Sequence, residues 1–123
     1  MNLLKILLAE DDPFNQLLIR KVVKDAGFML DVVDNGQVAI DKLQEQDYDL
    51  VLMDVEMPVM NGYEATSYIR EHLGNKSNIP IIIVTNIAGT QEAAKCMLLG
   101  ANTYLSKPFK SEQLLDEIAT LVI

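Results

Sequence analysis

The stretch DLVLMDVEMP, residues 49–58, holds a short apolar run at 49–53 that ends in a carboxylate, Asp54. An almost continuous apolar run of this length is typical of a strand that is buried on both faces of a parallel sheet. Four further runs of this kind occur along the chain, at residues 5–9, 29–33, 79–84 and 102–105. The sequence therefore predicts five strands.

Between these runs, apolar residues recur three and four positions apart, as they do on one face of a helix. The resulting stripes span residues 14–26, 38–43, 65–73, 93–98 and 114–122. Asp12 followed by Pro13 is typical of an N-cap with proline at the first helical position. Gly27, Gly74 and Gly100 stand where a left-handed residue commonly ends a helix. The sequence thus predicts a helix after each strand.

Strict alternation of strands and helices predicts an α/β fold, with parallel strands joined by right-handed crossovers and helices on both faces of the sheet. Five such units favour a flavodoxin-like (βα)5 three-layer sandwich with the strand order 2-1-3-4-5. The length of 123 residues matches one domain, residues 1–123. Ligands in these folds bind beyond the carboxyl ends of the strands, so we expect the functional residues there.

Composition excludes several classes of partner. Eighteen acidic and ten basic residues give a net charge of −8, whose field repels nucleic-acid phosphates and anionic lipids. The only cysteine, Cys96, cannot form an intramolecular disulfide, and no run reaches the ~18 apolar residues of a membrane span. We therefore expect a cytoplasmic protein that binds neither nucleic acid nor membranes.

Carboxylates follow two neighbouring strands of the predicted sheet. Glu10, Asp11 and Asp12 come directly after the first strand, and Asp54 ends the third. Carboxylates this close repel one another unless a cation lies between them, and hard oxygen ligands suit Mg²⁺. The sequence predicts a magnesium site at this edge of the sheet.

A hydroxyl and an ammonium group are expected at the same edge. Thr85 ends the fourth strand, and Lys107 follows the fifth. Transfer of a phosphoryl group onto a carboxylate needs a nucleophile, a metal that neutralises the incoming oxygens, and donors for their charge. The four strand ends supply this combination.

Over essentially its whole length, the chain resembles the receiver domains of two-component response regulators. The residues that carry the resemblance are Glu10-Asp11, the stretch 53–58 with Asn61-Gly62, Thr85, Tyr104 and Lys107-Pro108-Phe109. The resemblance implies a signalling switch, not a turnover enzyme, which takes a phosphoryl group from a histidine kinase or a histidine phosphotransfer protein. Residues 10–16 and 53–62 look like receivers attached to hybrid sensor kinases, which favours a piece of a larger protein over a single-domain regulator.

The resemblance also implies a role for each residue of the site. Asp54 would accept the phosphoryl group, and Thr85 and Lys107 would contact its oxygens. The oxygen ligands of Mg²⁺ would come from Asp11, Asp54, the backbone carbonyl of Glu56 and, through water, Glu10. Family structures lead us to expect a cis peptide between Lys107 and Pro108, although such bonds are only ~5–6% of those before proline.

Three further roles concern switching and lifetime. Tyr104 would move inward together with Thr85 after phosphorylation. Glu56 and Ile87 would flank the path of the attacking water, and the bulk of Ile87 would lengthen the life of the acyl phosphate. Asn86 replaces the small residue that usually follows Thr85 in the family, so the mouth of the site differs here.

Two other functions remain open from the sequence. Asp54-Val55-Glu56 loosely resembles the Asp-x-Asp motif of haloacid-dehalogenase-like enzymes, which would make the chain a small Mg²⁺-dependent phosphatase, but Met57-Pro58 departs from that pattern. The chain could also be an interaction module of the same fold that is never phosphorylated, although such modules usually lack a key acid or lysine. Asp12, His72 and Cys96 are expected to have structural roles only.

Overall fold

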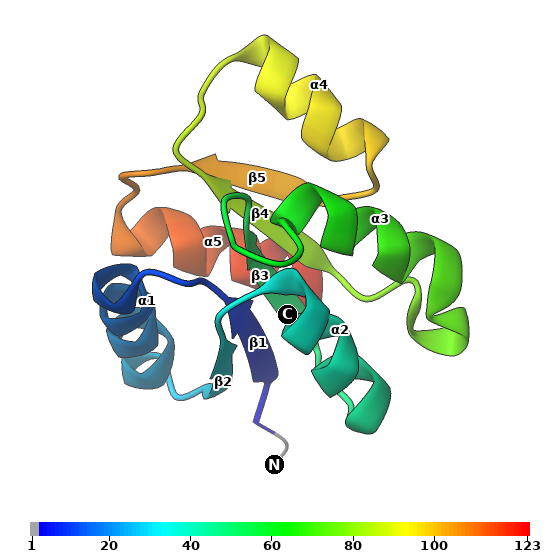
Figure 1. Ribbon diagram of the computed structural model, residues 1–123. Helices are drawn as coiled ribbons and strands as arrows, with labels where there is room; N and C mark the ends of the chain where they lie inside the picture. Colours follow the sequence, from blue (N-terminus) through cyan, green and yellow to red (C-terminus); the bar gives the residue numbers. More distant parts are fainter. Residues whose placement is uncertain (1–2) are drawn as a thin grey trace.

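The computed structural model describes residues 3–123 (Figure 1). In these residues, five strands alternate with five α-helices and one short 3-10 helix, η1. The elements in chain order are β1 (Lys5–Ala9), α1 (Pro13–Asp25), β2 (Met29–Val33), α2 (Gly36–Glu45), β3 (Leu50–Asp54), α3 (Gly62–His72), η1 (Gly74–Lys76), β4 (Ile81–Thr85), α4 (Thr90–Leu98), β5 (Thr103–Ser106) and α5 (Ser111–Val122).

The strands form one parallel sheet with the order β2-β1-β3-β4-β5, as the sequence predicts. The order reverses between β1 and β3, where Ala9 pairs with Met53. Strand bounds differ from the predicted runs by at most two residues. β4 begins at Ile81 because Pro80 has no amide hydrogen to give to the ladder.

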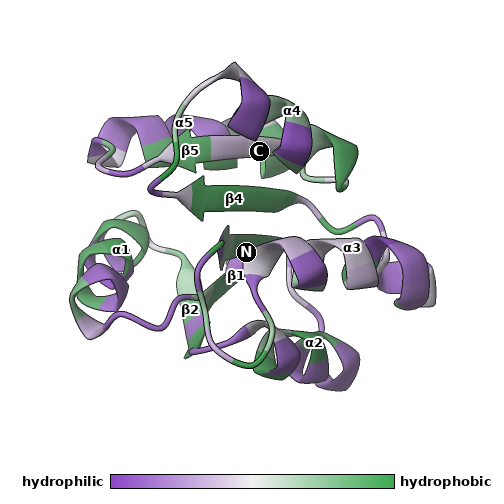
Figure 2. Ribbon diagram, turned by 45° about the horizontal axis from the view of Figure 1, so that its top comes forward, coloured by the Kyte–Doolittle hydropathy of each residue, from purple (hydrophilic) through white to green (hydrophobic). Residues whose placement is uncertain are grey.

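Helices cover both faces of the sheet, and the strand residues between them are mostly apolar (Figure 2). Alternate strand residues enter two separate cores. One core, which contains Leu7 and Met53, packs against α2, α3 and α4. The other, which contains Leu8 and Leu52, packs against α1 and α5. Burial on both faces explains why the strand sequences are almost continuously apolar.

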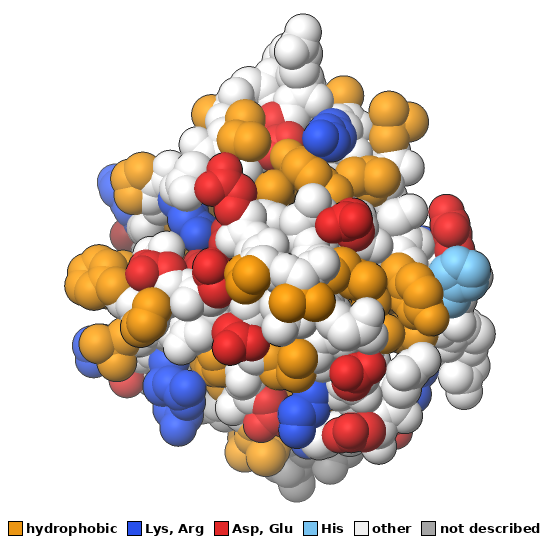
Figure 3. Space-filling model, viewed as in Figure 1, with side chains coloured by type: hydrophobic (Ala, Val, Ile, Leu, Met, Phe, Trp, Pro, Cys, Tyr) orange, Lys and Arg blue, Asp and Glu red, His pale blue; other side chains and the backbone are white. Residues whose placement is uncertain are grey.

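The apolar stripe predicted in α1 is only partly buried. Ile19 and Val23 lie in the core, whereas Phe14, Leu17 and Leu18 are 65%, 62% and 50% exposed. A stripe shows which side of a helix is apolar, but not how much of that side the sheet covers. Apolar side chains consequently gather on the surface over α1, at the left of Figure 3.

The buried face of α4 also differs from the predicted stripe. Met97 and Leu98 are exposed, and the residues that point inward are Glu92 and Cys96, one turn apart. The apolar stripe predicted at residues 93–98 therefore does not mark the buried face, because Met97 and Leu98 within it point outward. A carboxylate occupies the buried face of this helix, which apolar periodicity could not reveal.

No helix within residues 3–123 is long and apolar enough to cross a lipid bilayer.

Candidate functional site

The carboxyl ends of the strands bring the predicted residues to one edge of the sheet. Because Ala9 pairs with Met53, the next residues, Glu10 and Asp54, lie at the same level on neighbouring strands. Lys107 follows β5, and its backbone N–H donates to the Thr85 carbonyl at 2.7 Å. The Lys107–Pro108 peptide is cis, as expected.

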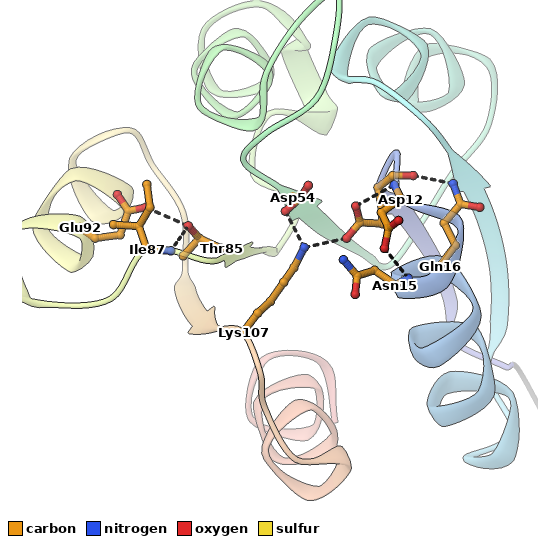
Figure 4. A network of polar contacts seen from close by, with 9 residues as sticks. Asp12, Asn15, Gln16, Asp54, Thr85, Ile87, Glu92 and Lys107 are labelled. Carbon is orange, nitrogen blue, oxygen red and sulfur yellow. Dashed lines mark hydrogen bonds and ion pairs between the residues drawn. The ribbon is translucent and has the colours of Figure 1, made fainter.

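One ammonium group joins the two buried carboxylates. Lys107 Nζ donates to Glu10 Oε1 at 2.8 Å and to Asp54 Oδ1 at 2.9 Å, and Figure 4 shows Lys107 reaching from its strand end to Asp54. The side chains of Glu10 and Asp54 are only 1% and 7% exposed. Two carboxylates thus share a single positive charge, and the pocket keeps an excess of negative charge.

The pKa of Asp54 reflects this imbalance. Burial raises the pKa of Asp54 from its usual 3.8 to about 6, the hydrogen bond from Lys107 opposes the rise, and the charge of Glu10 adds to it. Burial alone would lower the pKa of Lys107, but its bonds to Glu10 and Asp54 raise it above its usual value. Near neutral pH the Asp54 carboxylate is therefore available as a nucleophile, beside a charged lysine.

The acidic cluster has the ligands that a divalent cation requires. Glu10, Asp11 and Asp54 each place one carboxylate oxygen so that the three oxygens lie within 4.8 Å of one another. Asp11 is exposed, whereas Glu10 and Asp54 are buried with too little positive charge. Hard oxygen ligands around an uncompensated charge fit Mg²⁺.

The start of α1 holds Glu10 in place. Asp12 caps the helix by accepting from the Asn15 N–H at 3.0 Å, which confirms its predicted structural role. The Asp12 N–H in turn donates to Glu10 Oε2 at 3.1 Å, and the Gln16 amide donates to the Glu10 carbonyl at 2.6 Å.

The loop after β3 folds back tightly against Asp54. Asn61 caps α3 in a reciprocal pair with Glu64, and the Gly62 N–H donates to the Val55 carbonyl at 2.9 Å. A Cβ on Gly62 would lie 2.0 Å from the Asp54 carbonyl oxygen. Only glycine allows this approach, which explains why Asn61-Gly62 follows the apolar strand at this distance.

Thr85 lies at the same edge, but its side chain is engaged elsewhere. Its buried hydroxyl hydrogen-bonds Glu92 Oε2 at 3.2 Å and accepts from the Ile87 N–H at 3.0 Å. The Tyr63 hydroxyl donates to the same Glu92 carboxylate. Within residues 3–123, no side-chain hydrogen bond joins Thr85 to Asp54 or Lys107.

Sequence reasoning missed Glu92 and Tyr63. The available signal was a glutamate at the helical position one turn before Cys96, on what proved to be the inner face of α4. Tyr104 is half-buried and packs against the core that contains Cys96. The side chains of Glu56 and Ile87 are exposed, and Asn86 lines a groove of about 670 Å³ beside Lys107 and α1.

Comparison with known proteins gives consistent matches. A family model described as the response regulator receiver domain matches residues 6–119. The chain is 37% identical over 124 residues to hybrid signal transduction histidine kinase B of Dictyostelium discoideum, covering 93% of this chain. It is 33% identical to the chemotaxis protein CheY of Halobacterium salinarum, covering 96% of each protein.

A solved structure with a similar fold contains a metal. It is the receiver domain of a sensor histidine kinase from Pseudomonas aeruginosa with a magnesium ion coordinated in the active site cleft. It is 36% identical to this chain, covers 98% of both chains and superposes with a TM-score of 0.90. By contrast with CheY, the chain spans only 6% of the Dictyostelium kinase and 12% of the sensor protein GacS of Pseudomonas syringae, which it also matches.

Proposed function

The chain belongs to the response regulator receiver domain family, and on that premise we propose that it is a phosphoacceptor switch whose acceptor is Asp54. The observation that carries this proposal is the shared ammonium group. Asp54 and Glu10 are buried carboxylates, and among residues 3–123 only Lys107 bridges them. Two buried carboxylates with one shared cation lower the stability of the fold. A bound cation and a phosphoryl group would balance and use these charges.

In the proposed reaction, an Asp54 carboxylate oxygen attacks the phosphorus of a phosphohistidine. The new P–O bond forms as the P–N bond breaks, and the bonding electron pair returns to the imidazole nitrogen. Glu10, Asp11, Asp54 and the Glu56 carbonyl would hold Mg²⁺, which when bound neutralises the charge on the phosphoryl oxygens. Lys107 already reaches Asp54 Oδ1, so a small movement would let it donate to the transferred group.

Residues around the acceptor are proposed to set the response. Thr85 would donate to the phosphoryl group, and Tyr104 would change its packing in concert with Thr85. The exposed side chains of Glu56 and Ile87 would tune the entry of the hydrolytic water. Replacing Ile87 with alanine is therefore expected to speed dephosphorylation, and an unchanged rate would remove Ile87 from the proposal.

The phosphodonor is proposed to be a histidine kinase or a histidine phosphotransfer protein in the cytoplasm. Residues 1–123 would act as one receiver domain, and the similarity to hybrid kinases suggests a place within a longer protein. The exposed apolar side chains Phe14, Leu17 and Leu18 belong to α1, which begins two residues after Asp11, and they would offer a contact surface for the donor. The chain would assist its own phosphorylation and dephosphorylation without turning over a separate substrate.

The test is incorporation of phosphate from acetyl phosphate with Mg²⁺, measured by intact mass. We expect one phosphoryl group on the natural protein and none on Asp54→Asn. Asp34→Asn is the matched control, because Asp34 follows β2 at the same edge of the sheet but lies outside the cluster. Full incorporation into Asp54→Asn would refute the assignment. Repeated release of phosphate from a phosphoester would instead favour the phosphatase alternative.

A further inference from the structure

We propose that Glu92 is a positioning residue that holds the Thr85 hydroxyl away from Asp54 until Asp54 is phosphorylated. The inference rests on the proposed function, because it concerns the group that Thr85 would contact after phosphoryl transfer. Figure 4 shows Thr85 between Asp54 and Glu92, with its side-chain bonds directed to Glu92 and Ile87.

The hydrogen bonds of Thr85 limit what its hydroxyl can do. A hydroxyl has one proton to donate, and a carboxylate only accepts. Thr85 Oγ1 therefore donates its one hydrogen bond to Glu92 Oε2, at 3.2 Å. Thr85 Oγ1 also accepts a hydrogen bond from the Ile87 N–H. Phosphoryl oxygens also only accept. The bond from Thr85 to Glu92 and the bond from Thr85 to a phosphoryl group thus exclude each other.

The surroundings of Glu92 make the hydrogen bond from the Thr85 hydroxyl important for keeping this carboxylate buried. Glu92 is 5% exposed, and no lysine, arginine or histidine within residues 3–123 forms an ion pair with it. Its partners are the hydroxyls of Thr85 and Tyr63. The Lys95 ammonium lies 3.9 Å from the centre of the Tyr63 ring, outside ion-pair contact with Glu92. A buried carboxylate that loses one of two donors pays a substantial desolvation cost.

The exchange would connect phosphorylation to α4. Glu92 is in the first turn of α4, and the N-cap residue of that helix, Gly89, gives it no side-chain cap. The bond from Thr85 to Glu92 therefore ties the first turn of the helix to the end of β4. When the Thr85 hydroxyl donates its hydrogen bond to the phosphoryl group, its bond to Glu92 is lost and the environment of α4 changes.

The test measures binding of beryllofluoride, a phosphoryl mimic, with Mg²⁺ to the full chain. Glu92→Met has a side chain of similar length without an acceptor, and Glu92→Gln keeps an acceptor oxygen without the charge. Hydrogen bonds to charged groups contribute ~1.5 kcal/mol or more, which corresponds to about tenfold in affinity. We expect the Kd to fall about tenfold in Glu92→Met and by less in Glu92→Gln.

Two controls separate this role from packing. Asp31→Asn alters another carboxylate that accepts from a tyrosine, Tyr48, at 2.6 Å, and it should leave the Kd unchanged. Thr85→Val should abolish the gain from Glu92→Met when the two are combined, because the effect acts through the Thr85 hydroxyl. A gain that persists in the double variant would overturn the proposal.

The outcomes also separate this inference from the proposed function. If beryllofluoride binds the natural protein and Asp54→Asn equally, or binds neither, the assignment of Asp54 fails. If binding depends on Asp54 but neither Glu92 variant tightens it, the positioning role alone fails. Circular dichroism checks folding first, and if Glu92→Met does not fold, the ratio of Kd values for Glu92→Gln and the natural protein decides.

Discussion

The two ends of the sheet both carry charged residues, but they balance those charges differently. At the amino ends of the strands, Lys5 pairs with Asp31 at 3.8 Å, and the Lys5 ammonium lies 5.0 Å from the centre of the Tyr48 ring. Lys76 donates to the Leu43 carbonyl at 2.5 Å and pairs with Asp47 at 3.4 Å. Lys5 and Lys76 thus each have at least one anion and are in contact with water, and the half-buried Arg70 nearby donates to the Ser77, Ile79 and Gly100 carbonyls.

At the carboxyl ends, Lys107 serves both Glu10 and Asp54, and all three side chains are nearly or fully buried. Asp11 adds a third carboxylate. The comparison indicates that matched, hydrated charges support the fold, whereas buried charges left unmatched mark the place where a ligand is expected. Changes at the carboxyl ends should therefore affect both stability and binding, and changes at the amino ends stability alone.

The largest difference is expected between two glycine-to-alanine substitutions. Gly62→Ala places Cβ against the Asp54 carbonyl oxygen, which backbone atoms cannot accommodate, and should cost about 3 kcal/mol. Gly27→Ala, near the amino ends, meets nothing within 4 Å and should cost only ~1–2 kcal/mol, through its positive φ of 87°. Urea unfolding measures both values. An equal loss of unfolding free energy in the two variants would mean that the loop after β3 shifts to make room for the Cβ without strain.

Mg²⁺ should stabilise the protein only through the carboxyl ends. A ligand at one hundred times its Kd adds about 2.7 kcal/mol to the free energy of unfolding. We expect that gain in the natural protein and in Asp31→Asn, and its near absence in Asp54→Asn. Thermal unfolding with and without Mg²⁺ provides the measurement. The same gain in all three proteins would place the metal elsewhere.

Asp54 should lower stability near neutral pH in the absence of metal. Its folded pKa of about 6 exceeds its usual 3.8, so the folded state binds the proton more tightly, and its contribution to stability falls as the pH rises between these values. Asp54→Asn should therefore be more stable by ~1–2 kcal/mol at pH 7.5. The difference in unfolding free energy between Asp54→Asn and the natural protein should decrease as the pH falls to about 4. Urea unfolding in EDTA measures this difference. A gap that widens on acidification would contradict the raised pKa.

The smallest effect is expected from Lys76 near the amino ends. Lys76→Met removes donors to the Leu43 and Gln46 carbonyls at the end of α2 and should cost about 1 kcal/mol. Phosphate incorporation from acetyl phosphate should stay unchanged, because Lys76 lies outside the acidic cluster. A fall in incorporation would show that the two ends are coupled and that the distinction between them is too simple.

Much of the fold could be predicted because the strands are buried on both faces. That burial produces the almost continuous apolar runs, and it places Glu10, Asp54, Thr85 and Lys107 at one edge once the strand order is known. Asp12 followed by Pro13 fixed the start of α1 through local hydrogen bonding. These features depend on neighbours in the sequence or on the regular geometry of a parallel sheet.

The orientation of side chains in the outer layer could not be predicted in the same way. The contact between Glu92 and Thr85 depends on how α4 rotates about its axis, and the apolar Met97 and Leu98 suggested a different inner face. Burial of Glu92 is stabilised by Tyr63, which comes from α3. Such a contact joins three elements, and no period in the sequence encodes it.

The most direct measurement is to locate the phosphoryl group on the chain. After reaction with acetyl phosphate and Mg²⁺, borohydride reduces an aspartyl phosphate to homoserine, and peptide mass spectrometry identifies its position. We expect homoserine at position 54 alone. Homoserine at position 11, 12 or 34, or a phosphorylated protein with no homoserine, would contradict the assignment of Asp54 as the acceptor.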